Sequence, residues 1–318
     1  MSDATPVGVT SRSFSRHPVL RAELLRCYPN VRFNDAGVSL KGEALIEFAR
    51  GCRKLIVALE RVDETILAGL PELEVVSKYG VGTDMLDKAA LIRRGIRLGW
   101  AGGVNKRSVA ELAIAFMISL LHQVPQASLQ VREGVWRNQK GAELSGRTVG
   151  IVGCGHIGKD LATLLRAFGC EVLANDILDF PEFYAAQRVE PTGLEELLRR
   201  SDVVSLHVPL DDSTRNILSA QRLALMKPAA VLINTARGGL VDEEALKRML
   251  VEGRLAAAGF DVFAAEPPGD LELLRLPNFL ATPHIGGSSE EAILAMGRAA
   301  IRGLDENRVP AADYPPSA

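Results

Sequence analysis

Three side chains able to move a proton or bind an acid follow predicted strands in the second half of the chain. Arg237, Glu266 and His284 each come a few residues after an apolar run. In a doubly wound sheet the carboxyl ends of the strands share one edge, and ligands bind there. A histidine can accept the proton of a secondary alcohol, a carboxylate can orient the ring, and an arginine can hold a carboxylate by two bonds. Each residue alone would more often be structural, but together they predict oxidation of a hydroxy acid or the reverse reduction.

A glycine-rich turn supplies the expected cofactor site. The apolar run 149–152 leads into Gly153-Cys-Gly155-His-Ile-Gly158, an amphipathic helix follows, and the next apolar run ends at Asp176. This order of strand, glycine turn, helix, strand and acid is the dinucleotide-binding fingerprint, in which the helix N-terminus faces the pyrophosphate. A carboxylate at Asp176 would accept hydrogen bonds from a ribose and repel a 2′-phosphate. We therefore expect NAD, rather than NADP, as the cofactor.

The elements that must position these residues are predicted to form two α/β domains. In the first part of the chain, short apolar strands alternate with helices, which predicts a parallel sheet covered on both faces. Its strands are expected at residues 7–10, 31–33, 54–59, 73–78 and 96–100. The second part is expected to form a six-stranded doubly wound sheet, with strands at residues 149–152, 171–174, 203–207, 230–234, 256–260 and 279–282.

Two glycine pairs, Gly102-Gly103 and Gly286-Gly287, interrupt this alternation and predict hinges between the domains. They define a discontinuous substrate-binding domain over residues 1–101 plus 288–318 and an NAD-binding domain over residues 102–287. Closure about the hinges would exclude water from the site. The helix predicted at 109–121 is apolar on more than one face, so its own domains or a second subunit should bury it. A helix capped by Asp84 is expected to run to Arg94, and a helix after the long one is expected to end at Trp136. The last helix is expected over residues 290–306, followed by a frayed tail at 310–318.

Composition excludes several classes of function. The 318 residues suit about two domains, and the formal net charge is −2 without a block of like charge, so a nucleic-acid or membrane-surface role has no electrostatic support. No apolar run reaches about 18 residues, and the N-terminus has no signal-peptide pattern. The cysteines, Cys27, Cys52, Cys154 and Cys170, are scattered, which predicts a cytoplasmic protein with reduced thiols and no metal site. Cys154 is interpreted as a small filler of the glycine turn, with redox sensing the less favoured alternative.

The motifs around these residues resemble those of the D-isomer specific 2-hydroxyacid dehydrogenase family, most nearly its D-3-phosphoglycerate dehydrogenase-like branch. The likeness covers nearly the whole chain and rests on Gly153-Cys-Gly-His-Ile-Gly158, His207-Val-Pro-Leu210, Asn234-Thr-Ala-Arg-Gly-Gly239, Phe260-Asp-Val-Phe-Ala-Ala-Glu-Pro267 and Thr282-Pro-His-Ile-Gly-Gly287. It implies a Rossmann NAD-binding domain, a flavodoxin-like substrate domain, a homodimer joined through the long-helix region, and catalysis by Arg237, Glu266 and His284. It also implies cofactor contacts at Val81, Ser108, Gly153, Gly155, His156, Ile157, Gly158, Asp176, Val208, Pro209, Thr214, Thr235, Ala236, Arg237, Asp261, His284, Gly286 and Gly287.

The substrate is less closely defined. The run from Lys78 to Gly82 resembles the family loop whose backbone N–H groups hold the substrate carboxylate, which implies substrate contacts at Lys78, Tyr79, Gly80, Val81, Gly82 and Arg237. Lys78 lies where phosphoglycerate enzymes carry a basic residue, whereas Glu60 would repel a phosphate and Arg61 could compensate. The candidates are 3-phosphoglycerate, glyoxylate, hydroxypyruvate and other 2-keto acids. An NADP-dependent glyoxylate/hydroxypyruvate reductase and a non-enzymatic, NAD-sensing corepressor are the alternative functions.

Overall fold

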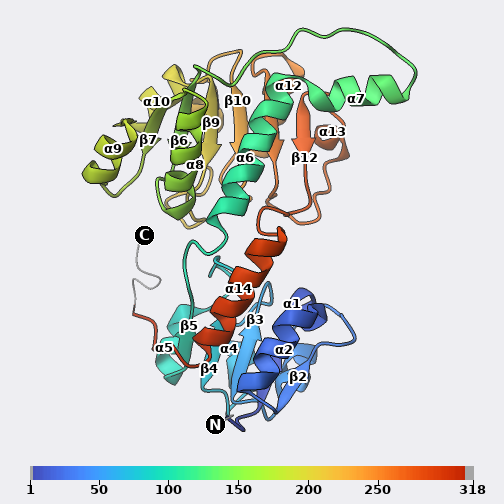
Figure 1. Ribbon diagram of the computed structural model, residues 1–318, viewed down its shortest axis with the longest axis vertical. Coiled ribbons are helices and arrows are strands. Elements are labelled where there is room, and N and C mark those ends of the chain that lie inside the picture. Colours follow the sequence, from blue (N-terminus) through green and yellow to red (C-terminus); the bar gives the residue numbers. More distant parts are fainter. Residues whose placement is uncertain (1–2, 312–318) are drawn as a thin grey trace. The chain divides into compact units, whose positions relative to one another are not determined.

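The structure, a computed structural model, describes residues 3–311 of the chain. Two compact units are present, Met1–Asn105 with Ser289–Ala318, and Lys106–Ser288. Each is built around a parallel sheet that carries helices on both faces (Figure 1). The prediction of two parallel-sheet α/β domains is therefore confirmed. Most of the tail that was expected to fray, residues 312–318, lies outside the described residues.

The smaller unit, described by itself, has the strand order β2-β1-β3-β4-β5 with every pair parallel. Its strands are β1 (Val7–Val9), β2 (Val31–Phe33), β3 (Lys54–Val57), β4 (Val75–Lys78) and β5 (Arg97–Gly99). The central strands β1, β3 and β4 are buried throughout, as expected of parallel strands covered on both sides. The order of the strands reverses between β1 and β3, and such a switch point is where doubly wound sheets bind ligands.

Helices cover both faces of this sheet. Those on one face are α1 (Arg12–Arg16), α2 (Pro18–Cys27) and α14 (Glu290–Gly303), and those on the other are α3 (Glu43–Ala49), α4 (Glu64–Ala68) and α5 (Lys88–Arg94). The sequence analysis missed α1, because five residues are too few to show helical periodicity. The predicted cap at Asp84 is wrong. Asp87 caps α5 by accepting from the Ala90 N–H, whereas Asp84 lies in a turn before the bridge between Val62 and Leu86.

The C-terminal helix α14 returns to this first sheet. Ser77 Oγ, on β4, donates to the carbonyl oxygen of Ala300 at 2.6 Å. A Cβ added to Gly99 on β5 would lie only 2.1 Å from the carbonyl oxygen of Gly303. Because neither glycine has a side chain, the end of α14 can lie directly against β5, and the unit is assembled from two separate chain segments.

The larger unit has seven parallel strands in the order β12-β11-β10-β9-β6-β7-β8. They are β6 (Thr148–Val152), β7 (Glu171–Asn175), β8 (Val189–Pro191), β9 (Val203–Leu206), β10 (Val231–Asn234), β11 (Ala257–Phe260) and β12 (Phe279–Ala281). The prediction of six strands was wrong because it missed β8, which pairs with β7 at the edge of the sheet. Only Val189 of its three residues is buried, and Pro191 is tolerated because the strand has a free edge. Val-Glu-Pro contains one apolar residue and therefore gives almost no strand signal in the sequence.

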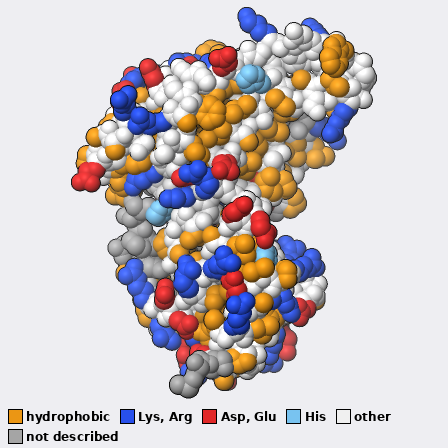
Figure 2. All heavy atoms as spheres, in the orientation of Figure 1, with side chains coloured by type: hydrophobic (Ala, Val, Ile, Leu, Met, Phe, Trp, Pro, Cys, Tyr) orange, Lys and Arg blue, Asp and Glu red, His pale blue; other side chains and the backbone are white. Residues whose placement is uncertain are grey.

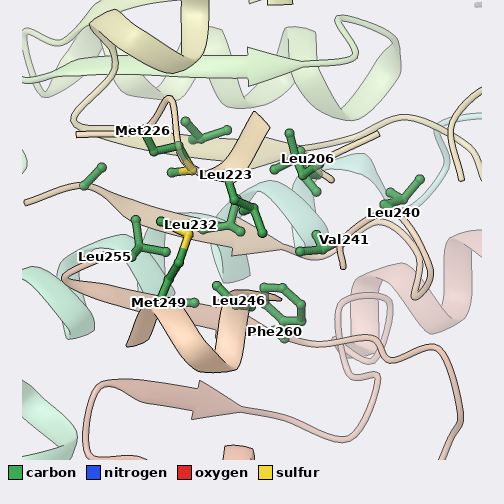
Figure 3. Close-up of a cluster of buried hydrophobic side chains, with 14 of the residues drawn as sticks. Leu206, Leu223, Met226, Leu232, Leu240, Val241, Leu246, Met249, Leu255 and Phe260 are labelled. Carbon is green, nitrogen blue, oxygen red and sulfur yellow. The ribbon is translucent and has the colours of Figure 1, made fainter. Parts of the chain in front are cut away.

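Two hydrophobic clusters, one on each face, hold the helices of this unit to its sheet. The helices are α6 (Lys106–Leu121), α7 (Val124–Arg132), α8 (His156–Ala167), α9 (Pro181–Gln187), α10 (Leu194–Arg200), α11 (Ala220–Leu223), α12 (Glu243–Val251) and α13 (Leu271–Leu274). On one face, Leu246 and Met249 of α12 point toward Leu232 and Phe260 of the sheet (Figure 3). This packing fixes the position of α12 on the sheet.

Within the larger unit described by itself, helix α6 is only partly buried, so the burial of its other faces by a second subunit stays a prediction. Phe116, Met117 and Leu120 lie in the core, whereas Ile114 and Ile118 are half-buried. Helix α7 ends at Arg132 and not at Trp136, and it has no buried residue. In Figure 1, α7 and the loop after it project from the rest of the larger unit. Among the described residues, no single helix is long and apolar enough to cross a membrane; α6 and α7 pass that test only as a pair, bent by 63°.

Candidate active site

His284 and Glu266 are in direct contact at the carboxyl edge of the larger sheet. The Nδ1 atom of His284, after β12, lies 2.9 Å from Oε2 of Glu266, after β11. Oε1 of Glu266 accepts from the Phe263 N–H at 3.2 Å, which limits rotation of the carboxylate. Because a carboxylate only accepts, Nδ1 of His284 donates this bond, and in the neutral form of the ring Nε2 carries the lone pair. Both side chains are partly exposed, so Nε2 can exchange a proton with a bound molecule.

Asp261 holds the turn that carries His284. Its carboxylate is 1% exposed and accepts from Thr282 Oγ1 at 2.5 Å and from the N–H groups of Ile285 and Gly286, both at 2.7 Å. His284 itself has φ 56°, a left-handed conformation that is uncommon for a non-glycine residue. Three charge-assisted bonds around the turn stabilise that conformation. Asp261 was expected to contact the cofactor, and the structure shows its carboxylate engaged within the His284 turn.

Ser108 and the second glycine pair belong to the same turn. The hydroxyl of Ser108, on the first turn of α6, donates to the carbonyl oxygen of Gly286 at 2.6 Å. Gly286 is buried and Gly287 is half-buried. The beginning of the long helix is thus joined to the His284 turn within the larger unit.

The Arg237 turn is shaped by Asn234, at the end of β10. The buried Asn234 side chain donates from Nδ2 to the carbonyl oxygen of Arg237 at 2.8 Å and accepts from the Ala236 N–H at 3.1 Å. The Arg237 guanidinium donates to the carbonyl oxygen of Ala236 at 2.7 Å. Sequence reasoning gave Asn234 no role, although a lone polar residue ending an apolar strand was the available signal. A Cβ on Gly238 would lie 1.9 Å from the Phe263 carbonyl, so this turn packs directly on the loop that leads to Glu266.

The glycine turn has the geometry needed to receive a dinucleotide. Gly153 has φ +95°, and a Cβ there would lie 2.7 Å from the carbonyl carbon of His207. A Cβ on Gly158 would lie 2.2 Å from the carbonyl oxygen of Gly153, so a side chain at either position would force strand and helix apart. Gly155 is the N-cap of α8 and supplies no side-chain cap. This 12-residue helix starts at His156, and its first N–H groups, which include those of His156 and Ile157, therefore remain available to a phosphate.

Asp176 lies beside this turn at the end of β7. Its Oδ2 accepts from the Cys154 N–H at 2.6 Å and its Oδ1 accepts from the Leu178 N–H at 2.9 Å. Burial, followed in size by the charge of Asp176, raises the pKa of Cys154 to about 11. Cys154 is therefore a protonated thiol at neutral pH, which favours the filler interpretation over redox sensing. Burial, with smaller contributions from Lys106 and Lys159, lowers the pKa of His156 below its usual value.

Two buried polar atoms without partners lie near the ends of β9 and β10. Among the described residues, Oγ1 of Thr235 and Nδ1 of His207 are buried and form no hydrogen bond. The other ring nitrogen of His207 lies 2.8 Å from Ser205 Oγ, and burial lowers the pKa of His207 to about 3. The ring is thus neutral and bound to the strand, which is typical of a structural histidine. Native proteins rarely leave such atoms unpaired, so these two fit a site that a polar ligand completes.

Further expected cofactor residues adjoin these atoms in the sequence. Val208 and Pro209 follow β9, and Ala236 follows Thr235. The hydroxyl of Thr214 donates to the carbonyl oxygen of Pro209 at 2.7 Å and accepts from the Asp211 N–H at 2.8 Å, so it braces their loop. Within the described part of the chain, no group of three or more histidine, cysteine, aspartate or glutamate side chains could hold a metal ion.

The expected substrate loop, which belongs to the smaller unit, is organised differently. Lys78 is 4% exposed, and its ammonium donates to the carbonyl oxygens of Ala58 at 2.5 Å and Tyr79 at 3.2 Å. The ring of Tyr79 is buried edge-on against Phe14, with centroids 5.5 Å apart. Gly80 has φ +115°. The side chains of Lys78 and Tyr79 therefore support the loop from its buried side, and residues 80–82 form its half-exposed surface.

The same loop continues into Val81 and Gly82. The carbonyl oxygen of Val81 accepts from Trp100 Nε1 at 2.8 Å, which fixes that peptide from the end of β5. Val81, expected to contact both cofactor and substrate, thus lies in the smaller unit, away in sequence from the glycine turn.

Comparison with known proteins adds an independent finding. Residues 114–286 match the family model described as "D-isomer specific 2-hydroxyacid dehydrogenase, NAD binding domain". A D-3-phosphoglycerate dehydrogenase of Methanocaldococcus jannaschii is 36% identical over 282 residues, covering 87% of this chain and 54% of the relative. A hydroxypyruvate reductase of Thermotoga maritima is 39% identical over 246 residues, covering 74% and 78% of the two chains. The chain spans about half the length of the D-3-phosphoglycerate dehydrogenases that it matches.

Solved structures show the same arrangement of elements. A D-lactate dehydrogenase from Aquifex aeolicus, complexed with NAD and lactic acid, superposes with a TM-score of 0.82 at 25% identity, over 94% of this chain and 93% of that one. A glyoxylate reductase from Paecilomyes thermophila gives a TM-score of 0.84 at 26% identity, over 95% and 96%.

Proposed function

The chain belongs to the D-isomer specific 2-hydroxyacid dehydrogenase family, and we propose that it catalyses hydride transfer between NAD(H) and C2 of a D-2-hydroxy acid or the matching 2-keto acid. The observation that carries this proposal is the 2.9 Å pair of His284 and Glu266, at the carboxyl edge of the sheet that bears the dinucleotide fingerprint. The larger unit would bind the cofactor and the smaller unit the substrate.

The roles of three side chains follow from their chemistry. Bound NAD would accept the hydride in one direction, and NADH would donate it in the other. Nε2 of His284 takes the hydroxyl proton during oxidation and returns it during reduction, while Glu266 keeps the ring in the tautomer with Nδ1 protonated. Arg237 binds the substrate carboxylate and stabilises negative charge on the C2 oxygen.

The cofactor is assigned to NAD on the charge of Asp176. Both carboxylate oxygens accept backbone N–H groups, so the side chain is held in one place beside the glycine turn. A 2′-phosphate would meet this fixed negative charge, whereas free ribose hydroxyls can donate to it. The other contacts proposed for NAD are those named above on the glycine turn, the β9 loop, the Arg237 turn and the His284 turn.

The charges around the smaller unit's switch point favour a substrate without a phosphate. Glu60, after β3, is held by the Ala58 N–H, which donates to its Oε2 at 2.6 Å. Arg61 is turned to Asp63, with Nε 3.2 Å from Oδ2. The Lys78 ammonium donates to the carbonyl of Ala58 instead of rising above the loop. We therefore favour hydroxypyruvate, glyoxylate or a related neutral-tailed 2-keto acid over the phosphorylated substrate.

The test is NADH oxidation with a panel of 2-keto acids. We expect turnover with hydroxypyruvate or glyoxylate and a kcat/KM at least about tenfold lower with 3-phosphohydroxypyruvate, equivalent to ~1.4 kcal/mol. A preference for the phosphorylated acid would overturn the substrate assignment but not the reaction. Tight NADH binding with no turnover of any keto acid would overturn the reaction and favour the corepressor-like alternative.

A homodimer is proposed from the surface of the larger unit. Leu129 and Val131 on α7 are 56% and 53% exposed, and Trp136 in the next loop is 91% exposed. Figure 2 shows further hydrophobic side chains gathered over α6 on the face in view. Exposed apolar surface of this extent is typical of an interface. Light scattering should give twice the chain mass of 34.2 kDa, and Leu129→Glu should reduce it; a monomeric wild type would refute the dimer.

The location of the protein is proposed to be the cytoplasm. The free thiols Cys27, Cys52, Cys154 and Cys170 support a reducing compartment. Cell fractionation tests this assignment, which is independent of the catalytic one.

A further inference from the structure

The loop that carries Glu266 has little packing of its own. Val262 and Phe263 are buried, but the residues from Ala264 to Pro267 are exposed. Within the loop, the Phe263 N–H donates to the Glu266 carboxylate, which orients the side chain but does not hold the loop to the sheet. Its position therefore depends on contacts from outside the loop.

Helix α12 supplies two such contacts from one face. Oε1 of Glu243, on the first turn, accepts from the Ala264 N–H at 2.9 Å. Nζ of Lys247, one turn later on the same face, donates to Oδ2 of Asp270 at 2.8 Å. The two bonds hold the loop at both ends, with Glu266 between them.

The opposite face of α12 is anchored in the core. Leu246 and Met249 point from the helix into the hydrophobic cluster around Leu232 and Phe260 (Figure 3). A helix held in this way is a rigid support, because its side chains cannot shift without opening a well-packed core. Glu243 is half-buried. Burial raises the pKa of its carboxyl group above the usual value, with smaller contributions from the charges of Asp270 and Glu244, and the bond from the Ala264 N–H opposes this shift only in part.

The Arg237 turn depends on the same segment. The backbone of Phe263 and Ala264 lies where a Cβ of Gly238 would be, at 1.9 Å and 2.4 Å respectively. A movement of the Ala264 peptide would therefore reach both the Glu266 carboxylate, two residues later, and the backbone beside Arg237.

We propose that Glu243 is a positioning residue for the reaction. By accepting the Ala264 N–H it fixes the position of Glu266, and through Glu266 the orientation of the His284 ring. Lys247 supports the loop at its other end through Asp270. This inference rests on the proposed function. A helix-capping role alone would predict equal effects of removing Glu243 and Glu244, because both add the same charge to the first turn of α12. Glu244 pairs with Lys247 at 3.4 Å, whereas the Ala264 N–H donates to Glu243.

The experiment compares Glu243→Ala, Glu243→Gln and Glu244→Ala in the full chain. We expect Glu243→Ala to lower kcat for keto acid reduction by about 10–100-fold with the KM for NADH within about twofold, because a small misplacement of a reacting group is costly. Glu243→Gln keeps an oxygen acceptor and should recover most of kcat. Glu244→Ala should match the wild type. Equal losses in all three variants, or wild-type kcat in Glu243→Ala, would overturn the inference.

Hydrogen exchange separates this inference from the proposed function. The segment 261–270 should exchange faster in Glu243→Ala than in Glu244→Ala, whether or not the wild type reduces any keto acid. If the wild type has no activity, the proposed function fails while faster exchange still supports the positioning of the loop. If exchange in this segment is unchanged, the positioning fails while activity stands. Lys247→Met, which releases Asp270, gives the same readout should Glu243→Ala not fold.

Discussion

The loops at the carboxyl edges of the two sheets differ in whether side chains or backbone are exposed. At the carboxyl edge of the larger sheet, the reactive atoms belong to side chains: His284 and Glu266 are bound to each other and partly exposed. At the equivalent edge of the smaller sheet, the side chains of Lys78 and Tyr79 are buried beneath the loop, and the backbone of residues 80–82 forms its surface.

The difference indicates how each loop could work. A proton transfer needs a side chain of suitable pKa, and such a group must be both oriented and accessible. Binding a carboxylate needs only N–H donors in a fixed arrangement, which a backbone braced from below can provide. Side-chain substitutions should therefore abolish chemistry in the first loop, while backbone conformation should control binding in the second.

Removal of the reactive side chains should have the largest effect. His284→Ala or Arg237→Ala should lower turnover by roughly 10²–10⁴-fold, because the proton acceptor or the carboxylate clamp is lost. Steady-state NADH oxidation measures the effect, and thermal unfolding checks that the fold is intact. The exposed His122, far along the chain from the strand ends, provides the control His122→Ala. Near-normal turnover in either variant would contradict the catalytic assignment.

A change of backbone conformation should have an intermediate effect in the smaller unit. Gly80→Ala puts a side chain at φ +115°, which costs about 1–3 kcal/mol and displaces the loop. We expect the KM for the keto acid to rise about tenfold while the KM for NADH is unchanged. Tyr79→Phe keeps the buried ring and should alter the KM little. Sensitivity to Tyr79→Phe together with tolerance of Gly80→Ala would reverse the comparison of the two loops.

The charge of Asp176 should affect the choice between NADH and NADPH. Asp176→Ala removes the carboxylate that would repel a 2′-phosphate, so the ratio of kcat/KM for NADH to that for NADPH should fall by roughly tenfold. The ratio for the wild type is the reference, and the keto acid is held constant. An unchanged ratio would show that Asp176 is not the selector.

Stability in acid, as distinct from activity, should depend on the buried His207. Burial lowers the pKa of His207 to about 3, whereas the unfolded chain keeps a histidine pKa near 6.5. Below about pH 6 the unfolded state binds a proton that the folded state does not, so stability is lost as pH falls, by up to about 1.4 kcal/mol per pH unit. Urea unfolding between pH 7 and pH 4 measures this slope. His207→Gln, which can still bond to Ser205, should reduce it; an equal slope would assign the loss to other groups.

Much of the fold and site could be predicted from local patterns. The strands of both sheets, except β8, are apolar runs between helices, and the glycine turn joins strand, helix and acid in a fixed order. Arg237, Glu266 and His284 could be selected because residues after parallel strands share one edge. Elements with few apolar residues were missed: α1 has one large apolar side chain in five residues, and β8 has one apolar residue followed by a glutamate and a proline.

The supports of the site could not be predicted in the same way. The bond between Glu243 and Ala264 joins residues 21 positions apart, and the bonds from Asp261 to Ile285 and Gly286 span 24 and 25 positions. Nothing in the local sequence of α12 distinguishes Glu243 from Glu244. Only the packing of α12 on the core directs Glu243 to the loop, while Glu244 is exposed and pairs with Lys247 of its own helix.

The sequence by itself determined the order of the strands along the chain, the nucleotide turn and the residue types that could carry out the chemistry, because these depend on period, spacing and side-chain pKa. The tertiary structure alone decided which of those side chains are available. It buried Lys78 among carbonyl oxygens and left His284 open beside Glu266, because burial and hydrogen bonding are set by contacts between segments far apart in the chain.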